Sequence, residues 1–125
     1  MKKNLKYNYV NASRIEDHGT RLYDVNGTRL PSVTTILART KDQKFLKDWK
    51  AKVGEQEAER IKNLSSRRGT SMHKFIECYV EDVGYDDFTG LGQEAKAMAE
   101  KIIEIGLAPV EEYYGSEVTL SLIHI

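Results

Sequence analysis

Cysteine is scarce in this sequence: Cys78 is the only one among 125 residues. A single thiol excludes an internal disulfide and any zinc or iron–sulfur site built from several cysteines, and it favours a reducing compartment. No general base is arranged beside Cys78 in the helix predicted to contain it, so we interpret it as a structural residue.

Net charge is also missing, since 19 lysines and arginines balance 19 aspartates and glutamates. A strongly basic chain would indicate nucleic-acid binding through bulk charge. In this chain any contact with nucleic acid must be local, and a basic groove is still possible where acidic residues elsewhere offset its charge.

Long apolar runs are absent as well. No stretch approaches the roughly 20 apolar residues of a membrane span, and the charged start MKKNLKYNYVN lacks the apolar core of a signal peptide. With 40% hydrophobic residues, the chain has the composition of one soluble domain. We therefore expect a cytoplasmic monomer with no membrane partner and no small-molecule cofactor.

The hydrophobic pattern predicts β-structure at the start and helices after it. Residues 7–30 are predicted as β, because RLYDV alternates apolar and polar side chains and Asn26-Gly27 is a strong signal for a type I′ hairpin turn. Ser32 is a good N-cap for the first helix, and Gly54 is a good stop for the second. The predicted helices cover residues 33–40, 42–53, 55–68, 71–83 and 91–105. Gly69-Thr70 breaks or bends the chain after the third helix, Thr70 can cap the fourth, and Gly106 ends the fifth.

Two of these helices carry apolar stripes that indicate a shared core. The stripe of the fourth helix contains Met72, Phe75, Ile76, Tyr79, Val80 and Val83. The stripe of the fifth contains Leu91, Ala95, Met98, Ile102 and Ile105. Trp49 could stack on a nucleobase, but its position on an apolar helix stripe favours core packing.

The C-terminal part of the chain is predicted as one extended strand, PVEEYYGSEVTL, with only the N-terminal hairpin to pair with. The last six residues, LSLIHI, match the in-frame translation of the end sequence that a transposase leaves on sequencing libraries. We interpret residues 120–125 as adapter read-through and expect the gene to continue past Thr119. His124 is therefore not considered as a metal ligand.

His73 and Glu77 are four residues apart, so they lie one turn apart on the same helix face. Imidazole and carboxylate can both bind a divalent metal or orient a metal-bound water. Two ligands alone do not make a catalytic site, and a hydrogen-bonded pair at a helix edge is the commoner meaning of this spacing.

Two groups of residues could hold phosphates. Arg67, Arg68 and Thr70 surround a predicted helix start, where cations and free backbone N–H groups bind anions; the alternative is that the arginines pair with the C-terminal dipole of the preceding helix. A second group of hydroxyls lies at another helix start, and its alternative is simple N-capping. That second group consists of Ser32, Thr34 and Thr35.

Four segments, in this order and spacing, resemble the RecB-like exonucleases of the PD-(D/E)XK superfamily, most of all the phage exonucleases and the mitochondrial genome maintenance exonuclease group. The segments are LPSVTTIL, DWKAKVGEQEAERI, SSRRGTSMHKFIECYV and GLAPVEEYYGSEVTL, and the resemblance covers most of residues 23–119. It implies an α/β (α+β) fold of the restriction-endonuclease type. Of that fold the chain would hold mainly the helical N-terminal part, a β-hairpin and the first core strand.

The resemblance also implies a function: Mg²⁺- or Mn²⁺-dependent cleavage of DNA at single-stranded ends, in the cytoplasm of a bacterial or phage-infected host cell. The family's metal-binding histidine maps to His73, and a supporting acid maps to Glu77. The acid on the first core strand maps to Glu117. DNA phosphates would be positioned by Ser32, Thr34, Thr35, Arg67, Arg68 and Thr70.

The family pattern continues with an aspartate and a D/E-x-K motif, which the sequence through Thr119 does not contain. A metal pair needs several carboxylates to be held and to acidify a water. We therefore expect residues 1–119 to be the N-terminal portion of one nuclease domain, inactive without the rest. The alternatives are a non-catalytic DNA-binding or protein-interaction module, and an unrelated enzyme in which His73 and Glu77 are incidental.

Overall fold

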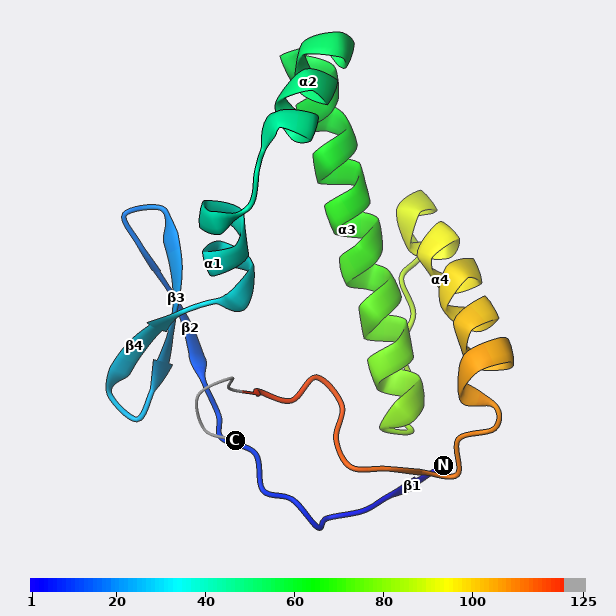
Figure 1. Ribbon diagram of the computed structural model, residues 1–125. Helices are drawn as coiled ribbons and strands as arrows, with labels where there is room; N and C mark the ends of the chain where they lie inside the picture. The colour runs from blue at the N-terminus through cyan, green and yellow to red at the C-terminus, as the bar shows by residue number, and fades with distance from the viewer. Residues whose placement is uncertain (121–125) are drawn as a thin grey trace. The chain divides into compact units, whose positions relative to one another are not determined.

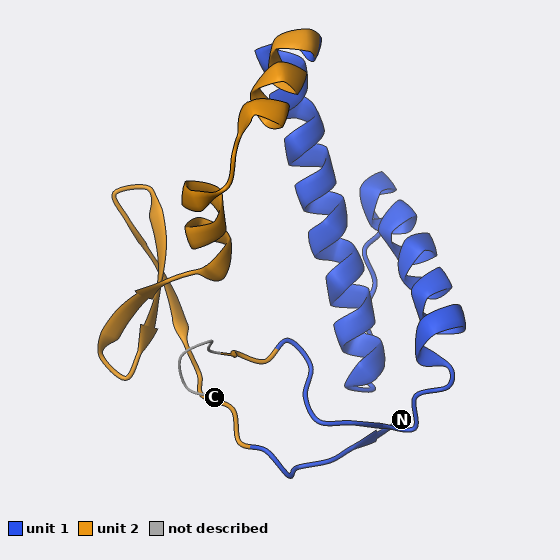
Figure 2. Ribbon diagram, in the orientation of Figure 1, with its two compact units in different colours: residues 1–7, 53–117 blue, residues 8–52, 118–125 orange. Residues whose placement is uncertain are grey.

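The computed structural model describes residues 1–120 (Figure 1), so the proposed read-through at residues 120–125 lies, except for Leu120, outside the described residues. The chain combines helices with small sheets. Its described part divides into two compact units: residues 1–7 with 53–117, and residues 8–52 with 118–120 (Figure 2). Within the described part, no helix is both long enough and apolar enough to cross a bilayer.

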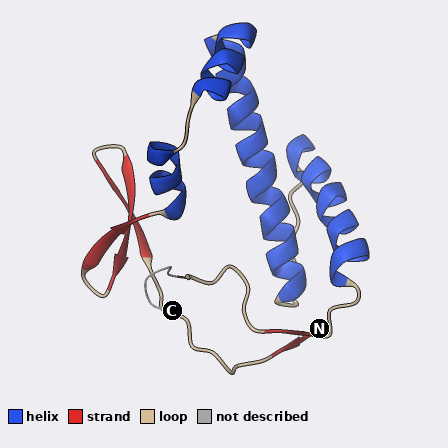
Figure 3. Ribbon diagram, in the orientation of Figure 1, coloured by secondary structure: helices blue, strands red, loops and turns tan. Residues whose placement is uncertain are grey.

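The second unit contains an antiparallel sheet of three strands in the order β2-β3-β4 (Figure 3). The strands are β2 (Ser13–Asp17), β3 (Thr20–Val25) and β4 (Thr28–Pro31). Asn26 and Gly27 join β3 to β4 with φ values of 53° and 83°, which confirms the predicted hairpin turn because type I′ needs positive φ at both positions. His18 and Gly19 join β2 to β3 with φ values of 50° and 77°, although His-Gly is not a common sequence signal for this turn.

Two short helices follow in the same unit, α1 (Val33–Thr40) and α2 (Lys44–Val53). The predicted cap of α1 is confirmed: the Ser32 hydroxyl accepts a hydrogen bond from the backbone N–H of Thr35 at 3.1 Å. Gly54, with a φ of 88°, follows the last residue of α2 as predicted. Trp49 is half-buried, whereas Phe45, one turn earlier on α2, is 86% exposed.

The long helix α3 (Glu55–Val80) belongs to the first unit and runs without interruption for 26 residues. The predicted break at Gly69-Thr70 is therefore wrong, and Thr70 caps no helix. A glycine in a helix interior costs about 1 kcal/mol relative to alanine. The buried face of α3 continues on both sides of Gly69, from Ala58 to Ser71, Phe75 and Cys78, and this packing outweighs the local cost.

The helix α4 (Gly90–Ile102) packs against α3 and continues into a π-helical turn, η1 (Ile103–Leu107). The prediction that the helical backbone ends at Gly106 is therefore wrong, because this glycine lies inside the π-helical turn. The side chains of Phe75, Ala95 and Ala99 form the core between the two helices.

The buried face of α4 differs from the predicted apolar stripe. Gly92, Ala95 and Ala99 are buried, whereas Met98 is 43% exposed and Ile105 is 74% exposed. The contact with α3 is made by Ala95 and Ala99 rather than by the largest apolar side chains, and Gly92 is buried against Asp87 of the preceding loop.

A two-stranded parallel sheet joins the ends of the first unit: β1 (Lys2–Lys3) pairs with β5 (Glu112–Tyr113). Only these two residues of the predicted strand PVEEYYGSEVTL form a strand within the described part of the chain. Glu117 has a φ of 52°, in the left-handed region, so the prediction that it lies on a core strand is wrong. In this segment only Glu112 and Tyr113 pair with residues of a neighbouring strand, because β1 is two residues long.

Candidate functional site

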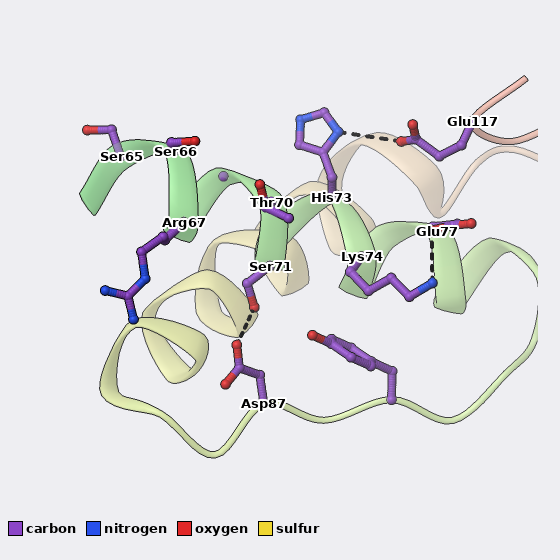
Figure 4. Close-up of a pocket in the computed structure, with 12 residues that line it drawn as sticks. Ser65, Ser66, Arg67, Thr70, Ser71, His73, Lys74, Glu77, Asp87 and Glu117 are labelled. Carbon is purple, nitrogen blue, oxygen red and sulfur yellow. Dashed lines mark hydrogen bonds and ion pairs between the residues drawn. The ribbon is translucent and has the colours of Figure 1, made fainter. Parts of the chain in front are cut away.

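An open groove of about 870 Å³ lies along the middle of α3, within the first unit (Figure 4). Its walls are made by α3 residues between Ser65 and Glu77, by Tyr85 and Asp87 of the loop before α4, and by Glu117. We call it the α3 groove. Most of the lining side chains are hydroxyls, cations or carboxylates, so the groove suits a polar ligand better than an apolar one.

His73 and Glu117 meet at one edge of the α3 groove, although 44 positions separate them in the sequence. The Nδ1 atom of His73 lies 3.5 Å from Oε1 of Glu117, and the two side chains are 67% and 55% exposed. Figure 4 shows the imidazole and the carboxylate pointing toward each other. The pair therefore offers one nitrogen and one oxygen donor to solvent, or an ion pair when the imidazole is protonated.

Glu77 lines the same groove, but its hydrogen-bond partner is Lys74. The Nζ atom of Lys74 donates to Oε2 of Glu77 at 3.3 Å. This hydrogen bond is the main reason why the pKa of Lys74 is raised above its ordinary value. Since α3 is regular here, Glu77 does lie one turn from His73, as the spacing predicts, and its carboxylate is neutralised by Lys74.

The two arginines predicted to bind phosphates have different surroundings. Arg67 lines the groove, and among residues 1–120 it forms no ion pair within 4 Å. Arg68 places Nη1 3.6 Å from Oε2 of Glu94 on α4. The predicted helix start beside them does not exist, so no free backbone N–H groups are available there; Thr70 contributes its side chain to the groove wall instead.

The second predicted phosphate group lies in the other unit, where its hydroxyls bond to one another. The Ser32 Oγ atom lies 2.7 Å from the Thr35 hydroxyl and 3.1 Å from the Thr34 hydroxyl, besides capping α1. The structure therefore agrees with the alternative prediction, in which Ser32 serves as the N-cap of α1. The role of these hydroxyls with phosphates stays a prediction.

Asp87 lines the α3 groove but was not among the predicted site residues. Its carboxylate accepts hydrogen bonds from the Thr89 hydroxyl at 2.7 Å, the Ser71 hydroxyl at 2.8 Å and the Thr89 backbone N–H at 3.1 Å. A Cβ atom on Gly92 would collide with this carboxylate, so the close approach depends on glycine. The Thr89 hydroxyl in turn caps α4 by accepting a hydrogen bond from the Gly92 backbone N–H at 3.0 Å, and the pattern D-x-T-x-x-G could have indicated this cap.

The hydrogen bonds from Thr89 and Ser71, with the nearby charge of Arg67, hold the pKa of Asp87 below its ordinary value. A carboxyl with a lowered pKa in the folded state stabilises the fold above its unfolded pKa and loses that effect as the pH falls through the folded value. We expect Asp87→Asn to lower the melting temperature by a few degrees at pH 7, with the difference shrinking below about pH 4.

Thermal melts followed by circular dichroism between pH 3 and pH 7 measure how the difference in melting temperature depends on pH. Asp82→Asn is the matched control, because Asp82 is exposed and its φ of 56° suits asparagine as well as aspartate. A difference between wild type and Asp87→Asn that stays constant over this pH range would contradict the assigned role of the carboxylate.

The described residues do not form a complete metal site by themselves. Among residues 1–120, no three histidine, cysteine, aspartate or glutamate side chains lie close enough together to hold an ion. His73 and Glu117 supply two donors, which is fewer than the three protein ligands of typical catalytic zinc sites.

Comparison with profiles of known protein families, with curated proteins and with solved structures found no match for this chain.

Proposed function

We propose that the chain is the N-terminal part of a metal-dependent DNA exonuclease of the PD-(D/E)XK type, which hydrolyses phosphodiester bonds at single-stranded ends. The observation that supports this most is the proximity of His73 and Glu117, 3.5 Å apart, at the edge of a groove that also contains Arg67. The pair supplies donors for a divalent ion, and the arginine supplies a charge for the phosphate.

A distance of 3.5 Å between the imidazole nitrogen and the carboxylate oxygen suits two neighbouring ligands of one ion, since each metal–ligand bond is about 2.0–2.2 Å long. Carboxylate oxygen is a suitable ligand for both Mg²⁺ and Mn²⁺, whereas imidazole nitrogen favours Mn²⁺ over Mg²⁺. A bound ion would polarise the phosphate and lower the pKa of a bound water. By the family resemblance, the remaining ligands come from an aspartate and a D/E-x-K motif on the C-terminal side of Thr119.

Arg67 is the residue we assign to the DNA backbone. Its guanidinium can form two parallel hydrogen bonds to a phosphate, and the Thr70 hydroxyl on the same groove wall can add another. Arg68 already pairs with Glu94, so it must break that contact before it can reach a phosphate.

We expect Arg67→Gln to weaken binding of single-stranded DNA several-fold and to reduce the slope of log K against log salt by about 0.7, the value for one lost phosphate contact on a single strand. Fluorescence anisotropy with a labelled oligonucleotide at several salt concentrations measures both effects. Arg68→Gln should reduce affinity less, because Arg68 is already engaged with Glu94.

Arg60→Gln is the matched control for this experiment, since Arg60 lies on the same helix, outside the groove, and pairs with Glu57 at 2.5 Å. This variant should leave the salt slope unchanged. If all three arginine variants change the affinity and the salt slope equally, the α3 groove is not the DNA-binding site.

A non-catalytic DNA-binding module is the second candidate, favoured by the lack of a third metal ligand within residues 1–120. Sequencing the source DNA across the codon for Thr119 separates the two candidates. We expect the reading frame to continue into an aspartate and a D/E-x-K motif within a few tens of residues. A stop codon directly after Ile125 would remove the catalytic proposal and leave the binding module.

A further inference from the structure

A second cavity, of about 330 Å³, lies beside the α3 groove in the same unit. Its walls include the apolar side chains of Phe75, Val83, Ala99 and Ile103, from α3, the following loop, α4 and η1. The volume is at the lower end of the range for small-ligand pockets, about 300–1,000 Å³. We call it the apolar pocket.

Tyr85 lines both the α3 groove and the apolar pocket. Its ring meets the ring of Phe75 edge-on, with centroids 4.7 Å apart and an angle of 66° between the planes. Phe75 is buried, so this contact fixes the Tyr85 ring against the core, while 39% of Tyr85 remains exposed. An immobilised aromatic side chain therefore separates a polar groove from an apolar pocket.

One cationic and one anionic side chain line the apolar pocket. Lys96 and Glu100 both contribute to its wall, one as a hydrogen-bond donor and one as an acceptor. Lys96 also lies 3.8 Å from Asp86, so its charge is already compensated. A neutral, flat ligand with donors and acceptors on its edge fits these surroundings better than an anion.

We infer that the apolar pocket binds one nucleobase of single-stranded DNA whose phosphate backbone crosses the α3 groove, with Tyr85 contacting the base. This inference rests on the proposed function and deepens it, because it assigns the preference for single strands to Tyr85. A base in a duplex is stacked and paired, so it is not free to enter the pocket. Contact between aromatic side chains and bases is how proteins hold single strands without reading their sequence.

The test compares two labelled strands of about ten nucleotides, within the usual site size of single-strand binders. One is oligothymidine, and the other is an abasic strand with the same length and charge. Titration of the full chain by fluorescence anisotropy should show the abasic strand binding about fivefold or more weakly, which is the loss expected for one stacked base.

Tyr85→Leu should bring the affinities of the two strands close together, because it removes the aromatic contact, whereas Tyr85→Phe should keep them apart. Tyr114→Leu is the matched control: Tyr114 also forms an edge-on pair, with Tyr7, at 5.3 Å and 66°, and it lines neither cavity. In the unaltered chain, amide NMR shifts at Val83 and Ala99 should respond to oligothymidine and not to the abasic strand. This readout does not depend on the folding of any variant.

Equal affinity for the two strands, with no shift changes at the apolar pocket, would overturn the inference while leaving a phosphate-binding groove and the proposed function intact. Failure of both strands to bind would remove the proposed function and the inference together.

Discussion

Replacing Phe75 by alanine is expected to lower the free energy of unfolding by about 3–5 kcal/mol, the usual cost of truncating a buried phenylalanine. Phe75 is 8% exposed and packs against Ala95 and Ala99, with Met72 and Ile76 at the edge of the cluster. Alanine cannot fill the space, and the Tyr85 ring also loses its support. Since domains of this size are stable by only about 5–15 kcal/mol, this loss removes a large fraction of the total stability.

Urea unfolding followed by circular dichroism measures this loss as a lower midpoint. Phe88→Ala is the matched control, because Phe88 is 87% exposed and the same atoms are removed from a side chain that is not buried. We expect Phe88→Ala to change the stability by less than about 0.5 kcal/mol. Equal midpoints for the two variants would show that the contact between α3 and α4 does not hold the first unit together.

The importance of Phe75 follows from how little else is buried. Within residues 1–120 the core contains five apolar residues, of which Phe75 is the only aromatic one and three are alanines. Large apolar side chains such as Val83 and Ile105 are 60% and 74% exposed. Exposed apolar surface of this kind favours association, so we expect poor solubility of the isolated chain.

Local signals in the sequence predicted the parts of the fold that depend on a few neighbouring residues. The turn at Asn26-Gly27, the Ser32 cap and the helix end at Gly54 each follow from the conformational freedom or hydrogen-bonding capacity of one or two residues. Such features need no knowledge of what lies elsewhere in the chain.

The predictions that failed depend on contacts between distant segments. Gly69 remains helical because Ser71 and Phe75 are packed beyond it. On α4, Ala95 and Ala99 are buried against Phe75 of α3, whereas Gly92 is buried against Asp87 of the preceding loop. Glu117 is not on a strand, because strand pairing in this region extends only to Glu112 and Tyr113. Each outcome reflects tertiary packing that overrides a local preference.

The same distinction applies to the α3 groove. Helical spacing correctly put His73 and Glu77 on one face. The i,i+3 spacing of Lys74 and Glu77 is also a local signal for the ion pair between them, although that pair was not predicted. The proximity of His73 and Glu117 depends on how the segment after β5 returns to α3, which no local pattern specifies. Two of the three hydrogen bonds of Asp87 come from Thr89, two residues later, and only the third, from Ser71 sixteen residues earlier, depends on a contact that no local pattern specifies.

His73→Ala is expected to weaken Mn²⁺ binding at the α3 groove by at least about tenfold, because even the partners of metal ligands contribute 10–100-fold to affinity. Broadening of NMR signals by the paramagnetic ion locates the site in the unaltered chain, and we expect it to centre on His73 and Glu117. In a longer chain that carries a D/E-x-K motif, the same substitution should lower the cleavage rate by at least about 100-fold, since a metal contributes several kcal/mol to the transition state.

The second unit provides a control of closely similar geometry. The Nε2 atom of His18 lies 3.4 Å from Oδ1 of Asp17, and the His18 side chain is 97% exposed. This pair offers the same two donor types at nearly the same separation, but it does not line the α3 groove. If Mn²⁺ binds both pairs equally, and His18→Ala weakens binding as much as His73→Ala does, then any exposed pair of imidazole and carboxylate suffices and the groove is not a metal site. If only His73→Ala has an effect, the surroundings of the two pairs decide the difference: the polar α3 groove beside His73, and Arg29, 3.7 Å from Asp17, beside the control pair.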